Sequence, residues 1–279
     1  MPVNNLSRKQ NVREFKEQFG FVTIAQNTDV DYLHLAYEQA KNIKATQKLN
    51  SYTVIVDDQT AEHLTSGHRK VFDHIVVMPV DLAKDDAWKL KNESQVFDLT
   101  PYKETIKLES DLWFTRDISH WLDAVRLREV CFSLHCRDYQ GQIVEQTPYR
   151  NIFRQNDLPD VYTGMYYMRY SRTATNLFKI VKSIYANWPT VKDNLVQCDD
   201  TPTTDVVFAL AVKLLGEEQC VIPTLDFFNF AHMKSGVQKW SDSQPWTDYV
   251  NVEQDGSMLR INNVNQYNPV HYHEKSFLS

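Results

Sequence analysis

Three short apolar runs, each followed at once by polar residues, constrain the fold of this chain most strongly. They are Phe19–Ala25, Tyr52–Val56 and Phe72–Met78. Their length and their β-branched and aromatic content are typical of strands buried on both faces. Between the first two runs, apolar residues recur at helical spacing over 29–43, with Thr28 or Asp29 placed to cap the first turn. Alternating strands and helices predict a mainly parallel sheet flanked by helices.

The same α/β pattern continues along the chain. We expect helices over Trp88–Leu99, Ile118–Arg128, Thr173–Trp188 and Thr204–Leu215, and strands over Thr105–Leu108, Val130–His135 and Gly164–Arg169. A polar loop is expected to run to about Asp160, and loops with short strands from Pro223 onward. At 279 residues the chain is long enough for one α/β domain with a sizeable core. We therefore expect a loose N-terminal arm over 1–18 and a single domain over 19–279.

The composition excludes several classes of protein. Hydrophobic residues make up 42% and charged residues 24%, which is ordinary for a globular protein and argues against disorder. No stretch approaches the roughly 18 apolar residues that span a bilayer, and the polar start lacks the apolar core of a signal peptide. We expect a cytoplasmic protein with no membrane partner. The net charge of −6 gives no general attraction to nucleic acid or anionic membranes.

Two carboxylates, Glu109 and Asp111, follow the strand at Thr105–Leu108 directly. Side chains at i and i+2 of an extended chain point to the same side, so the pair could share one hard cation. Such a pair also occurs in solvated turns, and the spacing alone leaves both interpretations open. Either His232 or His271 could complete the site, since imidazole joins carboxylates around manganese. His271 belongs to the segment His271–Lys275, a competing candidate for a metal or phosphate site, for which a polar surface or packing feature is the alternative interpretation.

Polar residues also follow the other strands. In open parallel sheets, ligands bind beyond the carboxyl ends of the strands, which puts Gln26, Asn27, Asp57 and Asp58 where a nucleotide would lie. For any single one of these residues, a polar loop end without a ligand is the alternative.

The segment Leu99–Asp111, LTPYKETIKLESD, resembles the TPY and DxD segment of glycogenin-like glycosyltransferases of the GT-A fold, whose DxD motif binds manganese and the nucleotide diphosphate. Three further segments follow in that family's order: Tyr162–Met165, Thr204–Asp205 and His232–Trp240, the last similar to an HxxGxxKPW segment. Upstream, Ala25–Tyr32 resembles the first nucleotide-binding loop. The chain departs from the pattern where Glu109 replaces the first Asp, where Gly236 comes one place late, and where no Pro precedes Trp240.

The resemblance implies a set of site residues. Glu109 and Asp111, with His232 or alternatively His271, would bind Mn²⁺ or Mg²⁺, and Asp111 and Asp205 would be catalytic. The donor-binding residues it implies are Ala25, Gln26, Asn27, Tyr32, Asp57, Lys91, Glu109, Ser110, Gly164, Gly236 and Lys239, with Lys239 meeting the phosphates. Asp205 has an alternative role as an acid complementing a helix dipole, and Lys91 as a solvent-facing lysine.

The function implied by the resemblance is metal-dependent transfer of a hexose or pentose from a nucleotide sugar, expected to be a UDP-sugar, to a hydroxyl acceptor. The donor-binding part would cover about 19–115 and the acceptor-binding part about 116–279. The overall pattern is also similar to small glycosyltransferases of T-even-like bacteriophages that modify hydroxymethylcytosine DNA. This makes modified double-stranded DNA a possible acceptor and, for a phage-encoded chain, the host cytoplasm the expected location. The phosphate contacts would come from Arg116, Arg126, Arg128, Arg137, Arg150, Arg154, Arg169 and Arg172.

Two alternatives stay open. The first is a transferase acting on a surface polysaccharide or a small sugar. The second is a nucleotide- or glycan-binding protein without catalytic activity, which the replacement of the first Asp of the motif by Glu109 would suit.

Overall fold

The computed structural model describes residues 13–86, 89–144, 150–223, 228–241 and 243–277. Its strands are β1 (Glu17–Ala25), β2 (Tyr52–Val56), β3 (His74–Val77), β4 (Tyr102–Leu108), β5 (Leu112–Trp113), β6 (Val130–Leu134), β7 (Val161–Arg169), β8 (Ala231–His232), β9 (Val252–Asp255), β10 (Met258–Ile261), β11 (Val264–Gln266) and β12 (Val270–His271). The α-helices are α1 (Tyr32–Thr46), α2 (Asp58–Ala61), α3 (Ser66–Val71), α4 (Val96–Leu99), α5 (Leu122–Val125), α6 (Asn151–Gln155), α7 (Arg172–Ala186), α8 (Trp188–Lys192), α9 (Thr204–Leu215) and α10 (Ser235–Gln238). The 3₁₀ segments are η1 (Lys89–Gln95), η2 (Ser119–Trp121), η4 (Glu217–Gln219) and η5 (Trp246–Asp248).

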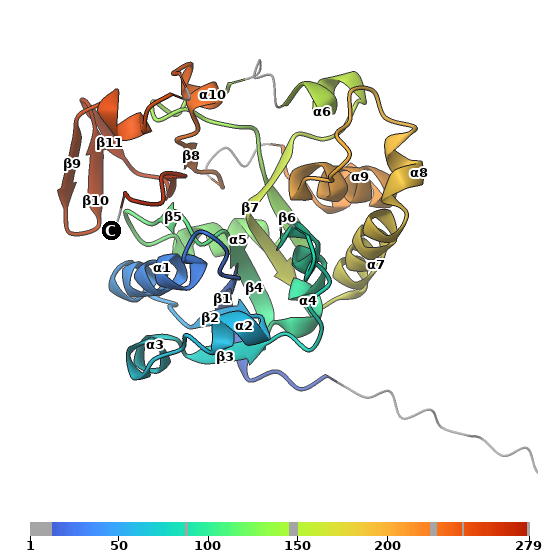
Figure 1. The fold of residues 1–279 in the computed structure, drawn as a ribbon, viewed down its shortest axis with the longest axis horizontal. Helices are drawn as coiled ribbons and strands as arrows, with labels where there is room; N and C mark the ends of the chain where they lie inside the picture. The colour runs from blue at the N-terminus through green and yellow to red at the C-terminus, as the bar shows by residue number, and fades with distance from the viewer. Residues whose placement is uncertain (1–12, 87–88, 145–149, 224–227, 242, 278–279) are drawn as a thin grey trace, which may run out of the picture.

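The central sheet has the strand order β3-β2-β1-β4-β7-β6 (Figure 1). β1 pairs in parallel with β2 and β4, and β2 pairs in parallel with β3. β7 lies antiparallel between β4 and β6. The predicted mainly parallel sheet is therefore confirmed. The strand order reverses between β1 and β4, which is the place where open α/β sheets bind ligands.

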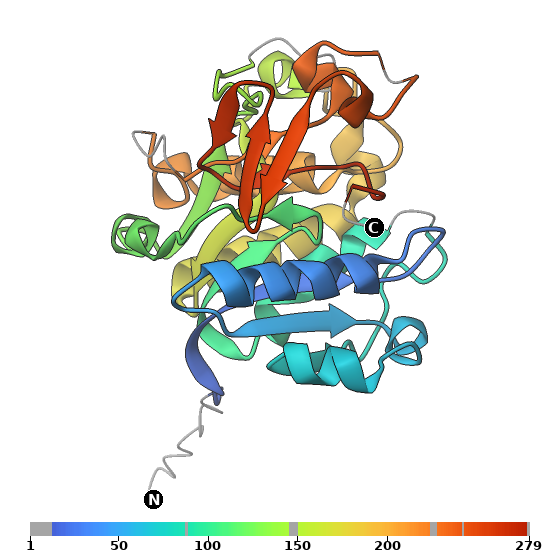
Figure 2. The same ribbon diagram turned by 90° about the vertical axis from the view of Figure 1, so that its left-hand side faces the viewer.

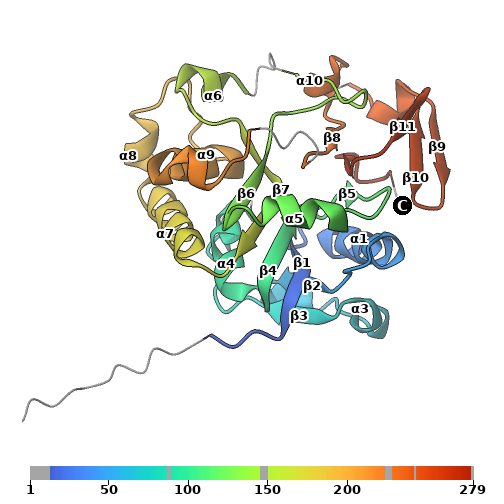
Figure 3. The same ribbon diagram turned by 180° about the vertical axis from the view of Figure 1, so that it is seen from behind.

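The two faces of the sheet pack on different sets of helices. Phe21 of β1 packs in one cluster with Leu33 of α1, whereas the adjacent Val22 packs in a second cluster with Leu177 of α7 and Phe208 of α9. Successive side chains of a strand point to opposite faces, so the apolar run of β1 is buried on both sides as its sequence predicts. Figures 1 and 3 show α1 on one side of the sheet and α4, α7 and α9 on the other.

The C-terminal segment forms a separate layer of short strands with its own small core. β9, β10 and β11 make an antiparallel sheet, and β12 lies between β5 and β8 in another. Met233, Trp246, Leu259 and Tyr272 are buried between them. Figure 2 shows this layer above α1. The pairing with β5 brings the end of the chain to the loop that follows β4, because His271 lies opposite Leu112.

Several predicted helices are shorter or tighter in the structure. The segment expected over Trp88–Leu99 is the 3₁₀ segment η1 followed by α4, with Trp88 outside the described residues. In η1 the Ser94 hydroxyl donates to the carbonyl of Lys91 at 2.7 Å, a local bond that competes with α-helical pairing. The helix expected over 118–128 is reduced to η2 and α5, and α6 lies within the loop expected up to residue 160.

The first helix begins later than predicted. Asp31 caps α1 by accepting the backbone N–H of His34 at 3.0 Å, and neither Thr28 nor Asp29 is its cap. The reason lies in the loop after β1, where the side chain of Asn27 accepts the N–H of Leu33 at 2.9 Å. At the N-terminus β1 begins at residue 17, inside the arm expected over 1–18, and residues 1–12 of that arm lie outside the described residues. In the described chain, every helix is too short or too polar to cross a membrane.

Candidate active site

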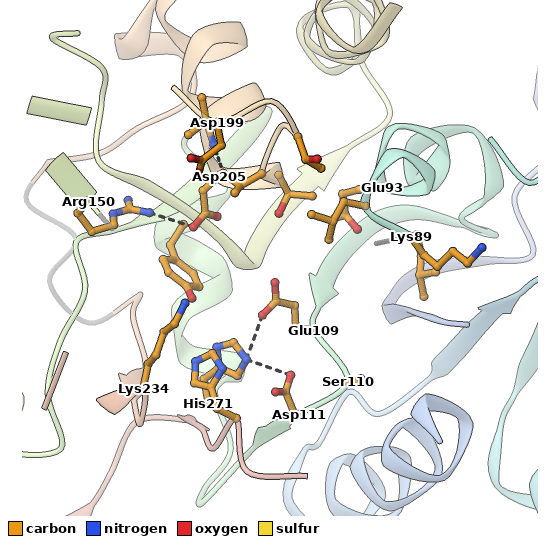
Figure 4. Close-up of a pocket in the computed structure, with 18 of the residues that line it drawn as sticks. Lys89, Glu93, Glu109, Ser110, Asp111, Arg150, Asp199, Asp205, Lys234 and His271 are labelled. Atoms are coloured by element: carbon orange, nitrogen blue, oxygen red, sulfur yellow. Dashed lines mark hydrogen bonds and ion pairs between the residues drawn. The ribbon is translucent and has the colours of Figure 1, made fainter. Parts of the chain in front are cut away.

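A cavity of about 820 Å³ opens at the carboxyl ends of β1 and β4. Gln26, directly after β1, and the loop Glu109–Asp111, directly after β4, line one side of it. The start of α9 lines another side, with Asp205, and the C-terminal segment contributes His271. Figure 4 shows Glu109, Asp111, Asp205 and His271 around a common space. The cavity thus lies where the reversal of strand order predicts a ligand site.

The main chain of the loop Glu109–Asp111 forms hydrogen bonds with three neighbouring segments. The N–H of Glu109 donates to the carbonyl of Gly164 in β7 at 2.8 Å, and the Gln39 side chain of α1 donates to the carbonyl of Glu109 at 2.6 Å. The N–H of Tyr272 donates to the carbonyl of Asp111 at 3.1 Å. These three hydrogen bonds hold the backbone that carries the two carboxylates.

His271 lies between these two carboxylates. Its Nε2 is 2.9 Å from Asp111 Oδ1 and 3.0 Å from Glu109 Oε2 (Figure 4). Burial disfavours a charged ring, but the attraction of both carboxylates outweighs it and raises the pKa of His271 to about 9. Burial likewise opposes ionisation of Glu109, and the charged His271 outweighs it and lowers the pKa of Glu109 to about 2. The same balance, with Lys275 as an additional cation, holds the pKa of Asp111 well below its usual range.

This cluster fits a divalent cation. One ligand atom each from Glu109, Asp111 and His271 lies within 4.8 Å of the others. Two carboxylate oxygens and one imidazole nitrogen form a donor set that suits Mn²⁺ or Mg²⁺. Within the described chain, the buried Nδ1 of His271 has no hydrogen-bond partner, so the ring is oriented chiefly by the two carboxylates.

A second cationic side chain stands beside the carboxylates. Lys275 forms an ion pair with Asp111 and lies 5.5 Å from the centre of the Tyr32 ring, and both side chains line the cavity. An ammonium group here is placed to meet an anionic ligand held by a cation at Asp111.

On the opposite wall, Asp205 is held by a network of donors. Its carboxylate accepts the N–H of Thr163 at 2.9 Å and the Thr163 hydroxyl at 2.6 Å, and it pairs with Arg150 at 2.9 Å. Burial raises the pKa of Asp205, while Arg150 and Thr163 oppose that rise. Asp205 lies in the first turn of α9, whose cap is Thr203, and α9 has the bounds that its sequence predicts.

A buried ion pair lies in the cavity wall between these groups. Lys107 of β4 is 2.7 Å from Glu93 of η1, and the two side chains are 5% and 7% exposed. The Tyr166 hydroxyl donates to the same carboxylate oxygen of Glu93 at 3.0 Å. Burial raises the pKa of Glu93 against the attraction of Lys107.

The structure brings seven of the predicted site residues to the cavity. They are Gln26, Tyr32, Glu109, Ser110, Asp111, Asp205 and His271. Eight others lie outside its lining, namely Ala25, Asn27, Asp57, Lys91, Gly164, His232, Gly236 and Lys239.

The structure gives several of these eight residues local contacts that hold the fold. Asp57 caps α2 by accepting the N–H of Thr60 at 2.8 Å, and it also accepts the side chain of Gln26 at 2.9 Å. Lys91 pairs with Asp86 at 3.0 Å. Lys239, expected at the phosphates, is exposed at the end of α10 with a left-handed φ of 64°. Lys275 is the lysine that stands beside the carboxylates.

His232, expected first as the third cation ligand, differs from that expectation. Its Nε2 lies 3.0 Å from the Tyr162 hydroxyl and 3.0 Å from His273 Nε2, and its ring stands on the side of His271 away from the carboxylate group. The reason is strand pairing. β12 separates β8 from β5, so His271 is the histidine next to the strand that follows Asp111. Burial, with the neighbouring His271, lowers the pKa of both His232 and His273 well below the usual value.

Among the charged residues of the cavity wall, Lys107 and Glu93 were not predicted as site residues, although Lys107 carried a visible signal. Lys107 is a charged residue between the apolar Ile106 and Leu108 of β4, which a buried partner such as Glu93 explains. His273 and Lys275 follow His271 at two-residue spacing. Arg150 was expected only as a phosphate contact, whereas the structure pairs it with Asp160 and Asp205.

A comparison of the sequence with protein-family models and with curated proteins finds no match. The structure is similar to that of mouse xyloside xylosyltransferase 1 in its apo form, with a TM-score of 0.53 and 11% identity over 92% of this chain and 98% of that chain. This chain shares the fold of that xylosyltransferase. A second solved structure, the glycosyltransferase GlyE of Streptococcus pneumoniae TIGR4, gives a TM-score of 0.46 and 9% identity over 74% of this chain and 45% of that chain. At 11% identity the likeness to the xylosyltransferase concerns the fold alone, and the predicted single α/β domain with a mainly parallel sheet flanked by helices is confirmed.

Proposed function

We propose that this chain is a glycosyltransferase that uses a divalent cation to transfer a sugar from a nucleotide-sugar donor to a hydroxyl group. The observation that carries the proposal is the convergence of Glu109, Asp111 and His271 on the wall of an 820 Å³ cavity at the carboxyl end of β4. A bound Mn²⁺ or Mg²⁺ would neutralise the negative charge of the departing diphosphate. The likeness to a xylosyltransferase fold supports this reaction class.

For the donor, we place the nucleotide along the β1 edge of the cavity, where Gln26 and Tyr32 line it. Asp57 supports this edge by accepting the side chain of Gln26 at 2.9 Å, and Ala25 and Asn27 flank Gln26 in the chain. Uridine is the proposed nucleoside, on the sequence resemblance. Lys275 is the side chain we assign to the diphosphate, because it already pairs with a carboxylate of the cation cluster.

For the reacting sugar, we propose that Asp205 faces it from the opposite wall, in an orientation fixed by Arg150 and Thr163. The proposed donor-binding part, 19–115, supplies both carboxylates of the cation cluster. His271 comes from the proposed acceptor-binding part, 116–279, so both parts build the site. Hydrogen bonds that fix a carboxylate in advance reduce the reorganisation required when charge develops on the sugar.

The acceptor we propose first is a hydroxyl of hydroxymethylated DNA, on the sequence resemblance to phage enzymes. Several of the arginines expected at phosphates pair instead with acidic side chains of the described chain. Arg126 pairs with Glu104, Arg150 with two aspartates and Arg169 with Glu129. A surface polysaccharide or a small sugar is therefore the alternative acceptor class, because its binding does not depend on a basic groove.

The test is a screen of nucleotide sugars with manganese, against hydroxymethylcytosine DNA, unmodified DNA and free sugars, read by mass spectrometry. We expect transfer that chelation abolishes and manganese restores. Asp111→Asn should abolish transfer, whereas Asp255→Asn, on the exposed β9, should retain it. Transfer to hydroxymethylcytosine DNA alone supports the DNA acceptor, and transfer to sugars alone supports the alternative.

Two outcomes would contradict the proposal. Donor binding without turnover on any acceptor would indicate a binding protein. Full activity after exhaustive chelation, or in Asp111→Asn, would remove the cation from the mechanism.

A further inference from the structure

Behind the carboxylate cluster lies a second group of potential metal ligands, formed only by histidines. One nitrogen each from His232, His271 and His273 lies within 4.8 Å of the others. His232 ends β8, His271 ends β12 beside it in parallel register, and His273 follows two residues later. His232 and His271 are 1% and 2% exposed, so the cluster is largely shielded from solvent.

The spacing of the rings is close to that of a tetrahedral site. His232 Nε2 and His273 Nε2 are 3.0 Å apart. Two nitrogens bound to one zinc ion at about 2.0–2.1 Å lie about 3.3–3.4 Å apart in tetrahedral geometry, so these two need to separate only slightly. The ring centres of His271 and His273 are 3.8 Å apart, and those of His232 and His271 are 5.1 Å apart. Imidazole rings bound to one tetrahedral zinc ion stand about 5 Å apart, so the rings of His271 and His273 must separate by about 1 Å for the third nitrogen to bind.

The backbone supports this arrangement. His273 has a φ of 55°, in the left-handed region that residues with a side chain seldom adopt. After this turn, the centre of the His273 ring lies 4.3 Å from that of His232 and 3.8 Å from that of His271. The Tyr162 hydroxyl, 3.0 Å from His232 Nε2, is the group that a cation bound to that nitrogen would displace.

We propose that His232, His271 and His273 form a binding site for a zinc-class cation, distinct from the carboxylate cluster and in competition with it. Imidazole nitrogens suit zinc, copper and nickel, whereas carboxylate oxygens suit manganese and magnesium. A neutral imidazole has only one free lone pair on its ring nitrogens, so His271 cannot bind a cation in each site without losing its remaining proton. Zinc in the histidine site removes His271 from the carboxylate site.

The test measures metal binding to the protein without donor, so its result does not depend on glycosyl transfer. Zinc affinity is measured by competition with a chromophoric chelator, and manganese affinity from the paramagnetic resonance of free Mn²⁺. His273→Gln is expected to weaken zinc binding by tenfold or more and to change manganese affinity by less than twofold. Glu109→Gln, the matched control, is expected to weaken manganese binding and spare zinc. Zinc should raise the apparent dissociation constant of manganese in the wild-type protein.

A second measurement needs no variant. Co²⁺ added to the wild-type protein should give the intense visible absorption of a tetrahedral site, and zinc should remove it. Loss of zinc and manganese affinity together in both variants, or weak octahedral cobalt absorption alone, would overturn the proposal. If the histidine site fails while manganese still binds and supports transfer, the proposed function stands without it.

Discussion

The buried pair Lys107–Glu93 allows a quantitative test of the cavity wall. Both side chains are almost fully buried, with their charged atoms 2.7 Å apart, and each lines the cavity. Lys107→Met preserves the length of the side chain and removes its charge, which leaves the carboxylate of Glu93 without its cation. Removing one partner of a buried pair typically costs about 3–5 kcal/mol. For a chain of this size, that corresponds to a fall in melting temperature of roughly 6–20 °C.

The pH dependence of this loss has a definite sign. Burial already raises the pKa of Glu93 above its usual value, and loss of Lys107 removes an opposing attraction, so the pKa rises further. A carboxyl with a raised pKa in the folded state contributes its full stability below its unfolded pKa and loses it as pH rises toward the folded value. The variant should therefore lose less free energy of unfolding, relative to the wild type, at pH 5 than at pH 8. Adding Glu93→Gln should recover part of the loss, because no unpaired charge remains.

Denaturant unfolding followed by circular dichroism measures this difference. The matched control is Lys182→Met, which breaks the exposed pair Lys182–Asp98, whose side chains are 44% and 54% exposed. Exposed pairs are worth about 0–1 kcal/mol, so the control should unfold almost as the wild type does. If Lys107→Met costs no more than the control and the cost does not vary with pH, Lys107 does not stabilise the Glu93 carboxylate as we describe.

Three further predictions concern packing, the cation and the sugar. Gly20→Ala should lower the free energy of unfolding by about 1–3 kcal/mol, because the added Cβ would lie 2.2 Å from the Tyr102 ring. Gly236→Ala is the control, since no atom lies within 4 Å of its added Cβ. Equal unfolding midpoints of the two variants would refute this prediction. Cation binding at pH 7 should release about one proton, since His271, with a pKa of about 9, must lose a proton to become a ligand. The buffer takes up this proton, so the calorimetric heat of binding should vary with the ionisation heat of the buffer. A heat that is the same in all buffers would contradict the prediction. Asp205→Asn should lower kcat with little change in the donor's KM, and the opposite pattern in steady-state kinetics would move Asp205 from the sugar to donor binding.

Local patterns in the sequence determined the framework. The apolar runs ending at Ala25 and Val56 predicted β1 and β2, because a strand buried on both faces needs a largely apolar segment, and the segment ending at Leu108 predicted β4. The cavity opens at the carboxyl ends of β1 and β4. Helical spacing and a capping residue gave α9 its bounds at Thr204 and Leu215. Glu109 and Asp111 come directly after a predicted strand, so the sequence also predicted their position at the edge of the sheet.

Only the tertiary structure decided which residues complete the site. His271 reaches Asp111 because β12 pairs with β5, a contact between segments about 160 residues apart that no local pattern encodes. The choice between His232 and His271 depended on the order β5-β12-β8, which is set by the packing of the C-terminal layer on Trp246 and Tyr272. Local propensity acts over a few residues of chain, whereas the charges of this site gather through strand pairing and burial.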